Sequence, residues 1–272
     1  MKFIFLALLQ GITEFLPVSS SGHLVFYKKA FGLNEPLLIF DIILHIATAL
    51  SVIVFLRKDL KLIFLESFFA INRLCRGDKF SDVWEKQNNF RTAVLVLAAF
   101  VPTVLVGLLL NQFADKLFDS LKVISITFFI TGLILFSTKI LKPIQKNRVN
   151  ILDAFLIGIV QAIAIIPGIS RSGTTISCGI FRGIEKNISA RFSFILAVPT
   201  VLAAGIYKLK DGFGQLNIST VTLLVSFAVA FLSGYVSLVI LSKMIARAKF
   251  HYFAYYCWLM GAACIYLLSK TT

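Results

Sequence analysis

The feature that most constrains this chain is a series of long apolar stretches without a charged residue. At about 1.5 Å per residue, helices of these lengths cover all or nearly all of a bilayer's hydrocarbon core. The composition agrees, because 58% of the residues are hydrophobic and 15% are charged, against about 25% charged in soluble domains. The sequence therefore predicts an all-α polytopic membrane protein. The predicted spans are residues 42–56, 92–110, 123–138, 192–207, 218–242 and 252–269.

Two further apolar segments are interrupted by polar and helix-breaking residues. Residues 3–26 contain Glu14, Pro17, three serines and a histidine, and residues 154–180 contain Pro167 and Arg171. The two halves of each segment, roughly 10–13 residues long, are too short to span a membrane. We therefore predict two re-entrant helical hairpins, at about 3–30 and 152–182. Irregular backbone at that depth is tolerated where it is buried in protein or lines a water-filled cavity.

The two interrupted segments resemble each other. A shift of 151 residues aligns Gln10 with Gln161, and S-S-S-G at 19–22 with S-R-S-G at 170–173. Three predicted spans follow each hairpin, so the second half would enter the membrane inverted relative to the first. We predict one membrane domain, 1–272, made of an inverted repeat of residues 1–150 and 151–272. The pentapeptide V-P-T-V-L at 101–105 and 198–202 does not fit this register, and we interpret its recurrence as coincidence.

The basic residues lie mainly in the short connections and predict the topology. With both termini on one side, that side holds eight Lys and Arg residues and the opposite side holds eighteen. The positive-inside rule then places both termini outside and the long loop 57–90 in the cytoplasm. We expect residues 60–74 of this loop to form an amphipathic helix along the interface, and the remainder to be polar and solvated.

Several other classes of protein are excluded or unsupported. The net charge of +14 belongs to membrane-flanking loops, so it does not indicate a nucleic-acid-binding protein. The four cysteines show neither a C-x-x-C pair nor a nearby histidine pattern, which argues against a metal or disulfide framework. The first apolar segment has no small-residue cleavage site, and we expect it to be part of the mature fold.

Three ionisable residues lie within apolar sequence and are candidates for function: Glu14, His23 and Arg171. A charge at the bilayer centre costs roughly 2.5–3.5 kcal/mol on insertion scales, so such residues are usually retained for a role. One alternative is purely structural, a salt bridge of Glu14 with Arg171 that joins the two hairpins.

The second turn has the composition of a phosphate-binding site. Arg171 offers a fork of donors, and the start of a half-helix favours an anion. The alternative is a serine-capped helix start without a ligand. The neighbouring candidates for phosphate contacts are Ser170, Ser172, Gly173 and Thr174.

The first turn combines hydroxyls with an imidazole. Ser19 and Ser21 are further candidates for phosphate contacts, whereas Ser20 and His23 make up the minimum pair of nucleophile and base. Gln10 and Glu14, four residues apart on one helix face, could hold a divalent cation such as Mg²⁺ or orient the attacking group.

A third stretch, F-D-I-I-L-H at 40–45, places Asp41 and His45 four residues apart near the end of a predicted span. We interpret it as an interfacial polar pair, with a role in the site left open.

These motifs resemble a known family, the undecaprenyl pyrophosphate phosphatases of the bacitracin-resistance type. The resemblance rests on Q-G-I-T-E-F-L-P-V-S-S-S-G-H-L at 10–24 and P-G-I-S-R-S-G-T-T at 167–175, supported by the stretch at 40–45. It implies a bacterial inner-membrane enzyme whose two hairpins meet at mid-membrane. Such an enzyme removes one phosphate from an isoprenyl pyrophosphate, recycles the lipid carrier for peptidoglycan synthesis and confers bacitracin resistance.

The resemblance also implies roles for individual residues. Glu14 and Gln10 stand at positions implicated in metal binding or acid–base chemistry, with Mg²⁺ or Ca²⁺ as the expected cation. Ser20 stands at the proposed nucleophile, His23 at its proton-transfer partner and Arg171 at the phosphate-binding arginine. The family has Glu or Gln at the position of Gln10, so the single carboxylate of this motif weakens the case for a two-carboxylate metal site.

Two mechanisms and one rival function stay open at this point. Either Ser20, assisted by His23, attacks the terminal phosphorus, or His23 or Glu14 activates a water molecule for direct attack. The pyrophosphate would be reached from the periplasmic side. The rival is a secondary transporter or flippase of an isoprenyl phosphate lipid, because broken helices in inverted repeats also describe transporters. The expected partners are the lipid substrate and membrane lipids, and the sequence is compatible with a homo-oligomer.

Overall fold

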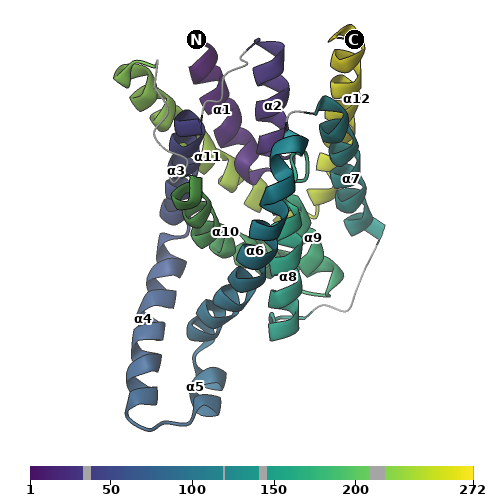
Figure 1. The fold of residues 1–272 in the computed structure, drawn as a ribbon. Helices are drawn as coiled ribbons and strands as arrows, with labels where there is room; N and C mark the ends of the chain where they lie inside the picture. The colour runs from purple at the N-terminus through teal and green to yellow at the C-terminus, as the bar shows by residue number, and fades with distance from the viewer. Residues whose placement is uncertain (33–37, 119, 141–145, 209–217, 272) are drawn as a thin grey trace.

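The computed structural model describes residues 1–32, 38–118, 120–140, 146–208 and 218–271, and these fold into helices (Figure 1). The first half contains α1 (Lys2–Phe15), α2 (Ser20–Ala30), α3 (Leu38–Phe55), α4 (Arg57–Cys75), α5 (Phe80–Lys86), α6 (Asn88–Phe118) and α7 (Leu121–Ile140). The second half contains α8 (Ile151–Ile163), α9 (Arg171–Phe181), α10 (Lys186–Lys208), α11 (Thr220–Ala246), the 3₁₀ helix η2 (Phe250–Tyr252) and α12 (Phe253–Thr271).

The described helices have the lengths and composition of membrane spans. Five of them are long and apolar enough to cross a bilayer by themselves, and the pair α3 and α4, bent by 75°, gives a sixth candidate. Each of the six predicted stretches lies within one helix except for at most two residues at an end, and α3, α6, α10 and α11 extend several residues beyond the predicted spans. The chain is therefore an all-α polytopic membrane protein, as predicted.

Each interrupted segment forms two short helices joined by a turn. α1 and α2 are 14 and 11 residues long, and α8 and α9 are 13 and 11 residues long. The two pairs approach from opposite ends of the molecule, and their turns meet in its interior (Figure 1). Both termini lie at one end, and α4 and α5 project from the other, which is the arrangement that the predicted topology requires.

The two halves contact each other in the same way twice: the first hairpin helix of each half packs along a long helix of the other half. α1 of the first half packs along α11 of the second, and α8 of the second half packs along α6 of the first. Small residues four apart permit both contacts: Ala7 and Gly11 on α1, and Gly158 and Ala162 on α8. These positions align under the shift of 151 residues. Small side chains let helix backbones approach closely where lipid offers no hydrophobic driving force.

The recurring V-P-T-V-L, interpreted above as coincidence, has a shared role in the structure. Thr103 of α6 and Thr200 of α10 both accept hydrogen bonds from the side-chain amide of Gln161, at 3.3 and 2.9 Å. The two pentapeptides are not equivalent positions of the repeat. They converge because α6 and α10 both pass the first helix of the second hairpin.

The loop after α3 is more ordered than the sequence indicated. The helix expected at 60–74 is present as α4, and the segment expected to be polar and solvated contains the short helix α5. Phe64, Phe68 and Phe69 of α4 are exposed. Such a face suits a membrane interface, where apolar side chains enter the headgroup region, but the placement of α4 along the interface stays a prediction.

Candidate active site

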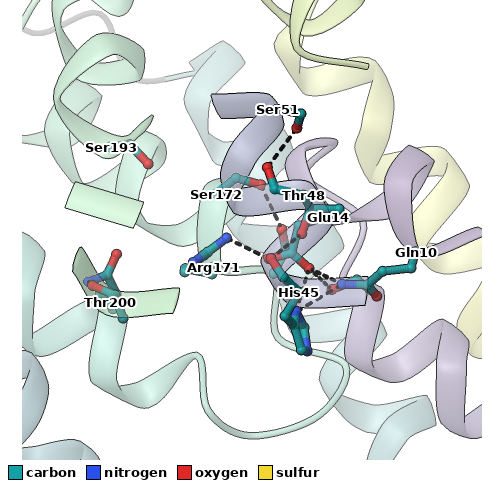
Figure 2. Close-up of polar contacts among 12 residues, drawn as sticks. Gln10, Glu14, His45, Thr48, Ser51, Arg171, Ser172, Ser193 and Thr200 are labelled. Atoms are coloured by element: carbon teal, nitrogen blue, oxygen red, sulfur yellow. Dashed lines mark hydrogen bonds and ion pairs between the residues drawn. The ribbon is translucent and has the colours of Figure 1, made fainter. Parts of the chain in front are cut away.

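Glu14 is the centre of a polar cluster formed by residues of four helices, α1, α2, α3 and α9 (Figure 2). Its Oε1 accepts a hydrogen bond from Arg171 Nη2 at 2.7 Å. Its Oε2 accepts from Gln10 Nε2 at 2.8 Å and from Ser20 Oγ at 2.7 Å. His45 of α3 places Nδ1 3.7 Å from the same oxygen. Because the Glu14 side chain is 6% exposed, the hydrogen bonds from Arg171, Gln10 and Ser20 supply the stabilisation that water would otherwise give.

The second helix of each hairpin begins with the same serine cap. Ser19 Oγ accepts from Gly22 N at 3.3 Å, and Ser170 Oγ accepts from Gly173 N at 3.1 Å. Serine is among the best N-cap residues because its oxygen satisfies an amide that has no helical partner. Ser19 also has a positive φ of 65°. A non-glycine residue in that region costs about 1–3 kcal/mol, and such strain collects at functional sites.

The two turns touch each other through glycines and are held by α7. A Cβ on Gly22 would lie 3.0 Å from Gly168 Cα, so a side chain there would push the tips apart. Gly168 has a φ of 88°, which favours glycine, and its N–H donates to Ser19 Oγ at 3.1 Å. Thr127 and Thr131 of α7 donate to the carbonyls of residues 167 and 168 at 2.6 and 2.8 Å. Arg171 therefore reaches Glu14 because both turns are fixed.

Free backbone amides at the tips form an anion-binding environment. The first two N–H groups of α2, at Ser20 and Ser21, have no acceptor among the described residues, and neither have those of α9, at Arg171 and Ser172. Two helix N-termini therefore direct unpaired donors and positive dipole ends to the interior, where negative charge is favoured. Arg171 adds a guanidinium whose side chain is 17% exposed.

Not all of the residues predicted to contact phosphate have a free donor. The hydroxyl of Thr174 donates to backbone carbonyls of its own helix, those of Ser170 and Arg171. Gly173 N–H donates to the Ser170 cap, and Ser172 Oγ donates to the Leu16 carbonyl at 3.3 Å. These residues build the tip, while Arg171 and the free amides are the donors that a ligand could use.

His23 lies apart from the Glu14 cluster. It is fully buried, its Nδ1 donates to the Ser19 carbonyl at 2.8 Å, and its Nε2 is 2.8 Å from the Tyr256 hydroxyl. Since a carbonyl only accepts, neutral His23 carries its proton on Nδ1 and accepts from Tyr256 through Nε2. In the structure the Ser20 hydroxyl thus donates its hydrogen bond to Glu14 and not to His23. The pairing of Ser20 with His23 stays a prediction.

Two residues of the site were not assigned to it from the sequence. His45 was considered with Asp41 as an interfacial pair, yet Asp41 bonds Lys28 at 2.6 Å while His45 Nδ1 accepts from Gln10 Nε2 at 3.0 Å. The spacing in F-D-I-I-L-H was the available signal for His45. Tyr256 gave no signal, because it contacts His23 across 233 residues of sequence.

The donor set fits a divalent cation only in part. Gln10 Oε1 is buried without a hydrogen-bond partner, which leaves it available as a cation ligand, although it is the amide nitrogen of Gln10 that contacts the Glu14 carboxylate. Within the described residues there is no cluster of three or more His, Cys, Asp or Glu side chains suited to a metal. A magnesium ion commonly uses one or two carboxylates and takes its other ligands from phosphates and water. The residues present fit that mode of binding, but not a cage made by protein alone.

Comparison with known proteins agrees with this geometry. Residues 3–263 match the family model described as bacitracin resistance protein BacA. A protein named undecaprenyl-diphosphatase from Desulforapulum autotrophicum is 39% identical over 95% of this chain and 94% of its own length. Proteins of the same name from Carboxydothermus hydrogenoformans and Halothermothrix orenii are 37% and 34% identical, over 97% and 98% of this chain and 95% and 97% of their own lengths. This chain belongs to the bacitracin resistance protein BacA family.

Proposed function

We propose that this protein is an undecaprenyl-diphosphatase, which hydrolyses undecaprenyl pyrophosphate to undecaprenyl phosphate and inorganic phosphate. The observation that carries the proposal is the ion pair of Glu14 with Arg171, at the meeting point of two helix N-termini with free amides. The relatives' printed name supports the same substrate. Recycling of the lipid carrier for peptidoglycan synthesis, and with it bacitracin resistance, would follow from this activity.

The chemistry begins with the hydroxyl of Ser20. Its hydrogen bond to Glu14 Oε2 makes the carboxylate the nearest base, so Glu14 takes the proton as Ser20 Oγ attacks the terminal phosphorus. The bond from that phosphorus to the bridging oxygen breaks, and the lipid monophosphate leaves with the proton that Glu14 had taken. Water, deprotonated by Glu14 or His45, then attacks the phosphoserine, and the proton passes to Ser20 Oγ as inorganic phosphate leaves. In the alternative, Glu14 activates water for attack on the same phosphorus.

Charge neutralisation supplies most of the rate in phosphoryl transfer, which requires little covalent chemistry from the protein. Arg171 and the free amides of Ser20, Ser21 and Ser172 would bind the oxygens of the terminal phosphate. Part of the Arg171 fork would leave Glu14 for the phosphate as substrate enters. His23 holds the first tip through Ser19, and a role in proton transfer would require its bond with Tyr256 to open.

A divalent cation, Mg²⁺ or Ca²⁺, is part of the proposal. Glu14 and Gln10 would hold it, and it would neutralise charge on the pyrophosphate when bound.

The localisation proposed is the bacterial inner membrane, with both termini periplasmic. The larger basic count at the end opposite the termini supports this orientation. The first hairpin would then open toward the periplasm, and the pyrophosphate would reach Glu14 and Arg171 from that side.

Phosphate release tests the proposed activity. The purified protein in detergent, given a long-chain isoprenyl pyrophosphate and Mg²⁺ or Ca²⁺, is expected to release one phosphate per lipid and leave the lipid monophosphate. Retention of the intact lipid without release under either metal would contradict hydrolysis. The same fold would then be read as a transporter or flippase of an isoprenyl phosphate lipid.

Ser20→Ala separates the two routes of attack. If Ser20 is the nucleophile, the variant loses about 10³-fold or more in kcat, because the covalent route is removed. Wild-type protein quenched during turnover of substrate labelled in its terminal phosphate then carries the label on Ser20. Ser137→Ala is the matched control, since its hydroxyl donates to the Leu133 carbonyl of its own helix, α7, and contacts no residue of the site. Activity of Ser20→Ala within a few-fold of wild type would establish direct attack by water.

A further inference from the structure

A half-open polar pocket shares no residue with the Glu14 cluster. It has a volume of about 220 Å³ and is lined by the start of α6, the first half of α10 and the segment that precedes α8. Three arginines from these separate parts of the chain line it: Arg91, Arg148 and Arg191. The start of α6 follows α5, so the pocket is at the end of the molecule opposite the termini (Figure 1).

The positive charge of this pocket is only partly neutralised. Arg191 pairs with Asp59 at 2.8 Å, with both side chains partly exposed. Arg91 donates to the Val149 carbonyl at 3.0 Å and lies over the Trp84 ring, so its charge is not cancelled. Arg148 is exposed, makes no ion pair among the described residues, and is close enough to Arg91 for the two guanidinium groups to repel each other. Such an arrangement is stabilised by an anion.

Apolar residues also line the pocket, and they favour a lipid over a free anion as its ligand. Leu95, Phe192 and Ile195 are buried, and Ile188 is half-buried. The pocket thus places guanidinium groups beside a closely packed apolar floor on membrane-spanning helices, with the half-buried Ile188 partly open to a ligand. Basic pockets between such helices bind anionic lipid headgroups. Inorganic phosphate would use the arginines but give Ile188 no apolar contact.

We propose that this pocket binds the phosphate headgroup of an anionic membrane lipid, whose chain runs along α6 and α10. The site is separate from the one assigned to hydrolysis, and it does not depend on that activity. The end of the molecule that holds the pocket also carries the larger number of basic residues, so it is the end expected to face an anionic leaflet.

Calorimetric titration of the purified protein with short-chain lipids tests the proposal. The probes are dihexanoyl phosphatidylglycerol, dihexanoyl phosphatidylcholine, farnesyl phosphate and inorganic phosphate. The pocket variant is Arg148→Gln/Arg191→Gln. The matched control is Arg73→Gln/Arg76→Gln, which removes one paired and one exposed arginine at the same end, since Arg73 pairs with Asp78 at 2.6 Å.

The pocket variant is expected to bind phosphatidylglycerol about 30-fold more weakly, because each of the two arginines near a headgroup contributes roughly five- to sixfold. The control is expected to bind it as wild type does, and phosphatidylcholine to bind less well than phosphatidylglycerol throughout. If farnesyl phosphate alone depends on the pocket arginines, the ligand is an isoprenyl monophosphate and the general phospholipid assignment is wrong.

Equal weakening in the pocket and control variants would overturn the proposal, and so would inorganic phosphate binding as tightly as either lipid. If the double variant does not fold, Arg148→Glu changes one exposed side chain and is expected to abolish the preference for phosphatidylglycerol. Release of phosphate from isoprenyl pyrophosphate serves only as a check on folding, so failure of the proposed hydrolysis would leave this binding result intact.

Discussion

Glu14→Gln is expected to lower kcat for phosphate release by about 10³-fold, because a glutamine of the same shape cannot take a proton. The carboxylate contacts Ser20, Gln10 and Arg171 at once, and no other carboxylate contacts Ser20 within the described residues. The substitution keeps the volume of the side chain. KM is therefore expected to change much less than kcat, as steady-state kinetics with an isoprenyl pyrophosphate would measure.

Asp41→Asn is the matched control for Glu14→Gln. Like Glu14, Asp41 is a carboxylate that forms an ion pair, in its case with Lys28 at 2.6 Å, but it lies near the start of α3 and outside the Glu14 cluster. Its neutralisation is expected to change kcat by less than about threefold, since it contacts no reacting group. A Glu14→Gln enzyme that kept more than a tenth of wild-type kcat would show that Glu14 is not the base.

Arg171→Ala is expected to lower kcat/KM by about 10³-fold or more, through both a higher KM and a lower kcat. Arg171, on the second hairpin, forms an ion pair with Glu14 on the first, and no other Lys or Arg among the described residues does so. Its loss removes a bidentate phosphate donor and leaves the Glu14 carboxylate buried without its counterion. Arg171→Lys is expected to recover part of the activity, because lysine restores the charge but not the fork.

Two further measurements show whether the effect of Arg171→Ala is chemical. Arg73→Ala removes an exposed arginine and is expected to leave kcat/KM unchanged. The double variant Glu14→Gln/Arg171→Ala relieves the unpaired carboxylate, so it is expected to melt at a higher temperature than Arg171→Ala while staying inactive. Recovery of activity in the double variant would mean that the pair is a structural salt bridge only.

The sequence was sufficient to predict the hairpins and spans because each depends on local composition. Proline, glycine and serine interrupt two apolar segments, and helices of the expected lengths flank each interruption. The meeting of Glu14 with Arg171 could also be expected, since two charges embedded in apolar sequence need partners. In the structure these two side chains form an ion pair at 2.7 Å.

The partner of Ser20 could not be predicted in the same way. Ser20 and His23 are neighbours on one helix turn, but His23 bonds the Ser19 carbonyl, where φ is positive, and the Tyr256 hydroxyl, so its imidazole does not reach Ser20. These determinants are tertiary, and Tyr256 lies in the last helix. A motif records which residues are near in sequence, not which atoms face each other.

The arginine pocket could not be predicted from the sequence for a related reason. The predicted topology assigned Arg91, Arg148 and Arg191 to three separate connections, and each one counted only toward the difference in basic residues between the two sides. Packing of α6 beside α10 and the segment before α8 brings them together. Likewise, the shared role of Thr103 and Thr200 is evident only from the structure, in which both accept a hydrogen bond from the Gln161 side chain.

Hydrolysis in water labelled with heavy oxygen tests the central claim most directly, because it reports which phosphorus is attacked. The purified protein would be incubated with undecaprenyl pyrophosphate, and both products would be weighed by mass spectrometry. We expect one labelled oxygen in the released inorganic phosphate and none in the lipid monophosphate, whether Ser20 or water attacks the terminal phosphorus. Label in the lipid monophosphate, or intact substrate with no product, would contradict a terminal phosphatase at Glu14 and Arg171.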